Sequence, residues 1–110
     1  MLPRHRTIAN RLLKAIFDTA NAWMQYNTVN FGSEKLSRVR VRASSPKGVV
    51  LQIRLDKIIG PLLAEVHIPA GTGWKTIDAG VIKHPKGIHN IVVRLRNNGT
   101  VELDWIQFKK

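Results

Sequence analysis

From Trp23 to the end of the chain, apolar and polar residues alternate with a period of two. Successive side chains of a β-strand point to opposite faces, so this alternation predicts strands with one buried and one exposed face. Half-buried strands of this kind are typical of antiparallel sheets, because parallel sheets use continuous apolar runs. We expect strands at 22–31, 36–44, 49–56, 62–68, 74–79, 88–96 and 101–108.

Clusters of turn-forming residues separate these segments, at 44–48, 60–61, 69–73, 84–87 and 97–99. The pattern predicts an all-β fold, a β-sandwich of two antiparallel sheets. Trp23 and Trp105 fall within strand patterns and are expected to pack in the core or between the sheets, and Tyr26 is expected to have a structural role. The other residues expected to face inward are Val39, Val41, Ala43, Val49, Leu51, Ile53, Leu55, Leu62, Ala64, Val66, Ile68, Ile91, Val93 and Leu95.

The beginning of the chain follows a different period. Between residues 7 and 17, Ile8, Leu12, Ala15 and Ile16 are spaced as on one face of a helix. We therefore expect two parts, a helical or poorly ordered N-terminal segment over 1–16 and the β-sandwich over 17–110. Arg11 and Lys14 interrupt any apolar stretch, so no signal peptide is expected.

The composition limits the class of protein. A length of 110 residues is enough for one domain. The 18 Lys and Arg against 7 Asp and Glu give a formal charge of +11, which favours polyanionic partners without choosing among them. The chain has no cysteine, and no apolar run approaches the ~20 residues that cross a bilayer, so no membrane span is expected.

Motifs for catalysis are missing from the sequence. There is no G-x-G-x-x-G, no G-x-x-x-x-G-K-[ST] and no G-x-S-x-G. His84 and His89 give an incomplete zinc ligand set. Glu102 and Asp104 share a strand face, where paired acids more often bind a cation or neutralise basic side chains than perform catalysis. We do not expect an enzyme.

Five segments resemble, in order, the motifs of carbohydrate-binding module family 6. They are Asn21-Ala-Trp-Met-Gln-Tyr-Asn-Thr-Val-Asn-Phe-Gly32, Ile53-Arg-Leu-Asp56 with Gly60-Pro61, Gly73-Trp74-Lys-Thr, Gly87-Ile-His-Asn and Leu103-Asp-Trp-Ile-Gln-Phe108. The resemblance implies a jelly-roll sandwich that binds polysaccharide such as xylan or β-glucan without catalysis. It also implies an extracellular or periplasmic location and attachment to a glycoside hydrolase, for example one of family 43.

The resemblance also implies where the ligands lie. The family's main sugar site is in loops at one end of the sandwich, and the matching positions here are Phe17, Trp74, Ile77 and Glu102. Trp74 either stacks on the sugar or packs over the sandwich end. Asp104 matches an aspartate that helps to bind a structural calcium ion, whereas the acid expected in the first strand has no match among residues 1–16.

Arginines alternate with core residues on two of the expected strands. If these strands share a sheet, they form a basic face suited to acidic glycans, because guanidinium forks bind carboxylate or sulfate, or else a solvated surface. These residues are Arg38, Arg40, Arg42, Arg94 and Arg96. Two other functions stay open. One is a basic β-domain that binds nucleic acid or other polyanions, although few aromatic residues lie among the arginines to stack on bases. The other is a structural spacer whose sugar site has decayed.

Overall fold

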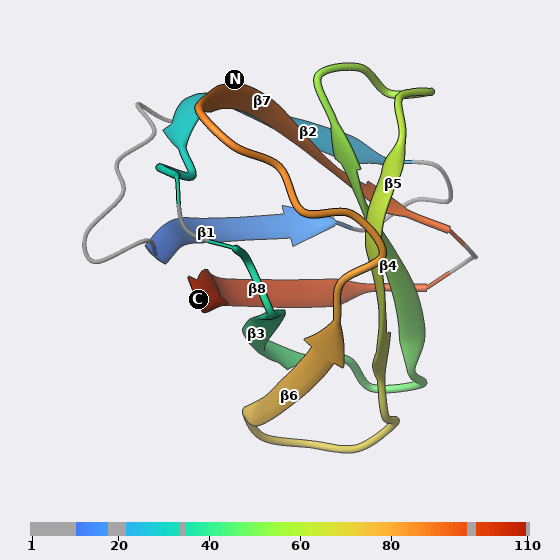
Figure 1. The fold of residues 1–110 in the computed structure, drawn as a ribbon. Helices are drawn as coiled ribbons and strands as arrows, with labels where there is room; N and C mark the ends of the chain where they lie inside the picture. The colour runs from blue at the N-terminus through green and yellow to red at the C-terminus, as the bar shows by residue number, and fades with distance from the viewer. Residues whose placement is uncertain (1–10, 18–21, 34, 97–98, 110) are drawn as a thin grey trace.

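The computed structural model describes residues 11–17, 22–33, 35–96 and 99–109. Eight β-strands make up this part of the chain (Figure 1). They are β1 (Arg11–Phe17), β2 (Trp23–Asn30), β3 (Arg38–Ser44), β4 (Val49–Leu55), β5 (Leu62–Ile68), β6 (Lys75–Gly80), β7 (Ile88–Leu95) and β8 (Val101–Lys109). No candidate membrane-spanning helix occurs among the described residues.

The strands form two four-stranded sheets in which every neighbouring pair is antiparallel. Sheet A has the order β1-β8-β3-β6, and sheet B has the order β2-β7-β4-β5. The two sheets enclose one hydrophobic core between them. The expected β-sandwich of two antiparallel sheets is confirmed, and each of the seven expected strand segments contains a strand.

The core follows the alternation seen in the sequence. In β4, for example, Val49, Leu51, Ile53 and Leu55 are buried and the intervening residues are half-buried. Every aliphatic residue expected to face inward is buried except Leu62, which is half-buried. The register of β4 and β5 shifts at this point, so Leu63 is buried in its place.

The aromatic residues of the strands differ in burial. Tyr26 is fully buried, as expected. Trp105 is half-buried, and the expectation that Trp23 lies in the core is wrong, because its side chain is 53% exposed. Trp23 pairs with Arg94 across β2 and β7, and both side chains belong to the outer face of sheet B.

The helix expected near the start of the chain is not found over Arg11–Phe17, which form β1. This strand pairs with β8 along its length, from Arg11 opposite Gln107 to Phe17 opposite Val101, and Figure 1 shows the two strands side by side. The hydrogen bonds to β8 favour an extended backbone over the helix that the residue spacing suggested. Residues 1–10, also part of the expected helical or poorly ordered segment, lie outside the described residues.

Candidate functional site

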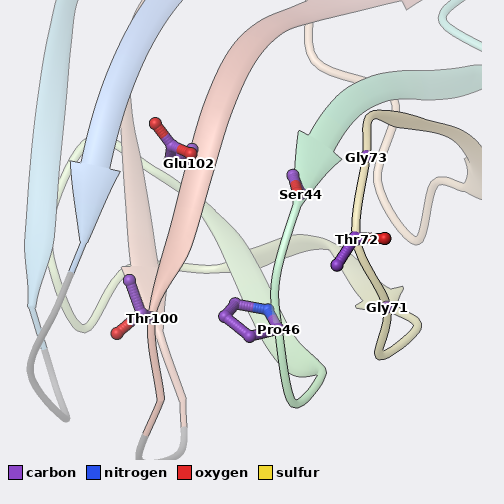
Figure 2. A pocket seen from close by; sticks show the side chains of 7 residues that line it. All are labelled: Ser44, Pro46, Gly71, Thr72, Gly73, Thr100 and Glu102. Carbon is purple, nitrogen blue, oxygen red and sulfur yellow. The ribbon is translucent and has the colours of Figure 1, made fainter.

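A pocket of about 360 Å³ opens at one end of the sandwich. Figure 2 shows its lining, which comes from the ends of β3 and β8 and from the loops beside them. The lining residues are Ser44, Pro46, Gly71, Thr72, Gly73, Thr100 and Glu102. The Pro46 ring, hydroxyl groups, a carboxylate and glycine backbone therefore surround an open hollow.

Hydrogen bonds from one serine join the loops at this end. Ser45 is 1% exposed. Its hydroxyl donates to the carbonyl of Thr100 at 2.6 Å, and its own carbonyl accepts the N–H of Gly71 at 3.1 Å. The loop containing Gly71 and Gly73 turns through positive φ angles of 142° and 86°, which glycine adopts without a steric penalty. These two hydrogen bonds of Ser45 thus hold the segments at Thr100 and Gly71, which both line the pocket, in place.

Trp74 follows directly after Gly73 of the pocket lining, and 41% of its surface is exposed. The guanidinium carbon of Arg42 lies 5.4 Å from the centre of its ring, which is within the range of a cation–π contact. The same guanidinium donates from Nε to Oδ2 of Asp104 at 3.0 Å. The Trp74 ring therefore contacts a cation that is itself paired with a carboxylate.

The structure brings some of the expected site residues together. Glu102 lines the pocket and lies opposite Ser44 across β8 and β3. Phe17 lies opposite Val101, so its backbone is at the same end of sheet A, and its side chain lies outside the described part of the structure. Ile77 is half-buried and packs against the core from β6.

The arginines do not form one basic face. Arg38, Arg40 and Arg42 belong to β3 in sheet A, whereas Arg94 belongs to β7 in sheet B and Arg96 follows directly after that strand. The condition for a shared basic face is not met, because β3 and β7 belong to different sheets. Carboxylates also neutralise three of them: Asp78 pairs with Arg40, Asp104 with Arg42 and Glu65 with Arg96.

The residues present do not fit the calcium ion that the resemblance implies. Among the described residues, no three acidic, histidine or cysteine side chains gather into a possible metal site. The carboxylate of Asp104 is paired with Arg42, and β1, the strand beside β8, has no acidic residue in its sequence Arg-Leu-Leu-Lys-Ala-Ile-Phe. Calcium prefers several oxygen ligands, and a guanidinium cation repels it.

The sequence reasoning missed Ser44, Thr72 and Thr100 as lining residues. They belong to turn clusters, and the only signal was that these clusters are rich in hydroxyl groups. It also missed the surface around Trp23 on the outer face of sheet B. Gln25, Asn27 and Arg94 are half-buried on that face. The hydroxyls and amides of both surfaces are groups that pair with sugar hydroxyls.

The family model for carbohydrate binding module (family 6) matches residues 7–110. This chain belongs to carbohydrate-binding module family 6. The match includes β1 and covers both sheets. The family model therefore confirms the family that the five sequence motifs indicated.

Known proteins similar to this family 6 module include an arabinoxylan arabinofuranohydrolase from Paenibacillus polymyxa. It is 26% identical over 92 residues, which are 78% of this chain and 14% of that protein. The chain thus spans about one seventh of the curated relative it matches.

The solved structures that share the fold include two sugar-bound modules. A family 6 carbohydrate-binding module from Clostridium cellulolyticum in complex with xylose has a TM-score of 0.79 at 21% identity, over 88% of this chain and 78% of that one. A family 36 module in complex with calcium and xylotriose has a TM-score of 0.67 at 17% identity, over 84% of this chain and 77% of that one.

Proposed function

We propose that this family 6 module binds polysaccharide without catalysis, at the pocket formed by Glu102, Ser44 and the 71–73 loop. The observation that carries the proposal is the exposed Trp74 ring next to a hollow lined by hydroxyls and a carboxylate. A pyranose ring buries its C–H face on an aromatic plane while its hydroxyls pair with polar groups at the edge. The pocket offers the polar contacts, and Trp74, next to its lining residue Gly73, offers the aromatic one.

The ligand we propose is a neutral β-linked polymer of the xylan or β-glucan type. Xylose is bound by the similar Clostridium cellulolyticum module, and the similar Paenibacillus polymyxa protein is named for its action on arabinoxylan. We propose that the module acts outside the cell, joined to a glycoside hydrolase of that kind. Attachment raises the effective concentration of the catalyst at the polymer even when each binding contact is weak.

The test is calorimetric titration of the module with xylo-, cello- and laminari-oligosaccharides. Trp74→Ala is expected to weaken binding by about tenfold, because an aromatic contact contributes roughly 1 kcal/mol beyond its buried area. The matched control is Trp23→Ala, which removes an exposed tryptophan from the outer face of sheet B. Circular dichroism checks that both variants keep the sandwich.

The outer face of sheet B is a second candidate surface for sugar, since Trp23 lies there among amide and guanidinium groups. Loss of binding in Trp23→Ala with full binding in Trp74→Ala would move the site to that face. If no oligosaccharide gives binding heat, the result would instead support the alternative that the domain is a structural spacer. Single-stranded DNA binding without a sugar response would support the polyanion-binding alternative.

A further inference from the structure

Arg42 lies on the outer face of sheet A, on β3 and therefore between β6 and β8. Toward β8 its Nε donates to Asp104 Oδ2 at 3.0 Å. Toward β6 its guanidinium carbon lies 5.4 Å from the centre of the Trp74 ring. One cation therefore connects a carboxylate on one neighbouring strand with an aromatic ring at the start of the other.

A bulge in β8 produces this arrangement. Arg42 lies opposite Trp105 and the next residue, Ala43, lies opposite Leu103, so Asp104 is the extra residue of the ladder. A bulge turns an additional side chain toward one face of the sheet. Asp104 and Trp105 are consequently both half-buried, and the carboxylate comes within reach of Arg42.

The neighbouring pair on β3 is different. Arg40 lies directly opposite Asp78 and donates to its carboxylate from both Nε and Nη2, at 2.7 and 3.3 Å. This two-bond geometry is common for arginine and a carboxylate. Arg42 makes only the Nε bond to Asp104, and the flat side of its guanidinium group is available to the indole.

We propose that Arg42 has two roles. It is the cation that neutralises the Asp104 carboxylate in place of a calcium ion, and it is the positioning residue for Trp74. The role toward Trp74 rests on the proposed sugar-binding function, and the role toward Asp104 does not. A guanidinium keeps its charge across the whole working range of pH, so the contact with the ring needs no metal and no protonation event. Trp74 is then held beside the pocket before any sugar arrives.

The first experiment measures metal dependence. The melting temperature of the wild-type module is expected to be the same in millimolar calcium chloride and in EDTA, and a calorimetric calcium titration is expected to give no heat from Asp104. Stabilisation by calcium that Asp104→Asn abolishes would overturn the proposal. Stabilisation by calcium that persists in Asp104→Asn would mean that the ion binds at another position. This result would support the proposal that Arg42, and not calcium, neutralises Asp104.

The second experiment compares Arg42→Gln with Arg40→Gln, which removes an ion pair two positions along the same strand. Arg42→Gln is expected to lower the melting temperature by about 4 °C more than the control, because it loses an aromatic contact as well as a carboxylate. It is also expected to shift the tryptophan emission, and this shift should vanish in a Trp74→Phe background. Arg42→Lys keeps the charge and is expected to recover part of both effects.

Equal melting temperatures for the two variants, or an emission change that persists without Trp74, would overturn the positioning role. Sugar affinity is the third measurement, and Arg42→Gln is expected to weaken binding roughly fivefold while Arg40→Gln leaves it unchanged. If the wild type binds no sugar, the proposed function fails, and the metal, stability and emission measurements still test Arg42 by themselves.

Discussion

The imidazole Nδ1 of His89 lies 3.0 Å from Oδ2 of Asp56, at the end of the sandwich opposite the pocket. The other ring nitrogen lies 2.9 Å from the carbonyl oxygen of Lys86. Asp56 also accepts the backbone N–H of Asn90 at 3.1 Å. These contacts join the connection after β4, the connection before β7 and the first residues of β7.

Acid should weaken this junction. The hydrogen bond from His89 holds the pKa of the Asp56 carboxyl below its ordinary value of 3.8. A lowered pKa in the folded state means that the contribution to stability is present above the unfolded pKa and is lost as pH falls through the folded pKa. The extra free energy of unfolding that wild type has over Asp56→Asn should therefore shrink as the pH falls below the ordinary carboxyl value of 3.8. Urea unfolding across this range measures it.

Asparagine is the appropriate replacement because Asp56 has a positive φ of 68°, a conformation that asparagine tolerates better than most residues. Asp56→Asn thus removes the charge with little backbone strain. Parallel pH profiles for the two proteins would show that the carboxylate of Asp56 contributes nothing to the acid dependence.

Gly60 should not tolerate a methyl group. A Cβ atom at this position would lie 1.9 Å from the carbonyl oxygen of Leu55 and 3.1 Å from that of Lys57. The same turn contains the hydrogen bond from Gly60 N–H to Lys57, so the backbone cannot move away without losing it. Gly60→Ala is expected to cost about 3 kcal/mol or more of unfolding free energy. Denaturant unfolding gives the value.

Gly80 provides the control for this substitution, since no atom lies within 4 Å of the position that its Cβ would take. Gly80→Ala should change the midpoint of unfolding only slightly. Equal midpoints for the two alanine variants would contradict the steric explanation.

The single tyrosine of the chain should lose its proton at a higher pH than a tyrosine in water. Burial raises the pKa of Tyr26 from 10.0 to about 12, because the tyrosinate anion loses its hydration in the core. The neutral phenol thus contributes stability that is lost as pH rises above the unfolded pKa of 10.0. Tyrosinate absorbance should appear near pH 12 in the folded protein and near pH 10 in urea. Titration of the folded protein near pH 10 would refute the prediction.

Glu102 should decide between neutral and charged sugars at the proposed site. An ionised carboxylate only accepts hydrogen bonds, which suits sugar hydroxyls and repels uronic acids. Glu102→Gln is expected to weaken binding of neutral oligosaccharides by about fivefold, since bonds to charged groups are stronger than bonds to amides. Binding of oligosaccharides with a glucuronic acid branch should strengthen in the same variant.

Calorimetry with both ligands measures the two affinities, and Glu102 is exposed, so the variant should fold normally. An unchanged preference between neutral and acidic ligands would place the sugar away from Glu102.

The strands from β2 to β8 could be predicted because their alternation is a local property of the sequence. The core positions of β4 show how closely burial follows it. β1 could not be predicted in this way. Its leucines and isoleucine fit a helical spacing, and its strand conformation depends on pairing with β8, which lies at the other end of the sequence.

The site was only partly predictable for the same reason. Trp74 and Glu102 could be found from the motifs, but their partners come from distant segments. Ser44 meets Glu102 through the pairing of β3 with β8, and Arg42 reaches Asp104 through a bulge that has no sequence signal of its own. Which sheet each arginine strand joins is likewise decided by the path of the whole chain.

The pairing of β1 with β8 also decides how this module can be joined to a larger protein. β1 begins at Arg11, opposite Gln107, and β8 ends at Lys109, opposite Arg38, while Phe17 and Ser44 mark the pocket end of the same sheet. Arg11 and Lys109 therefore both lie at the end of sheet A that is opposite the proposed sugar pocket. Under the proposed function, a catalytic domain joined at that end would leave the pocket open to a polysaccharide surface.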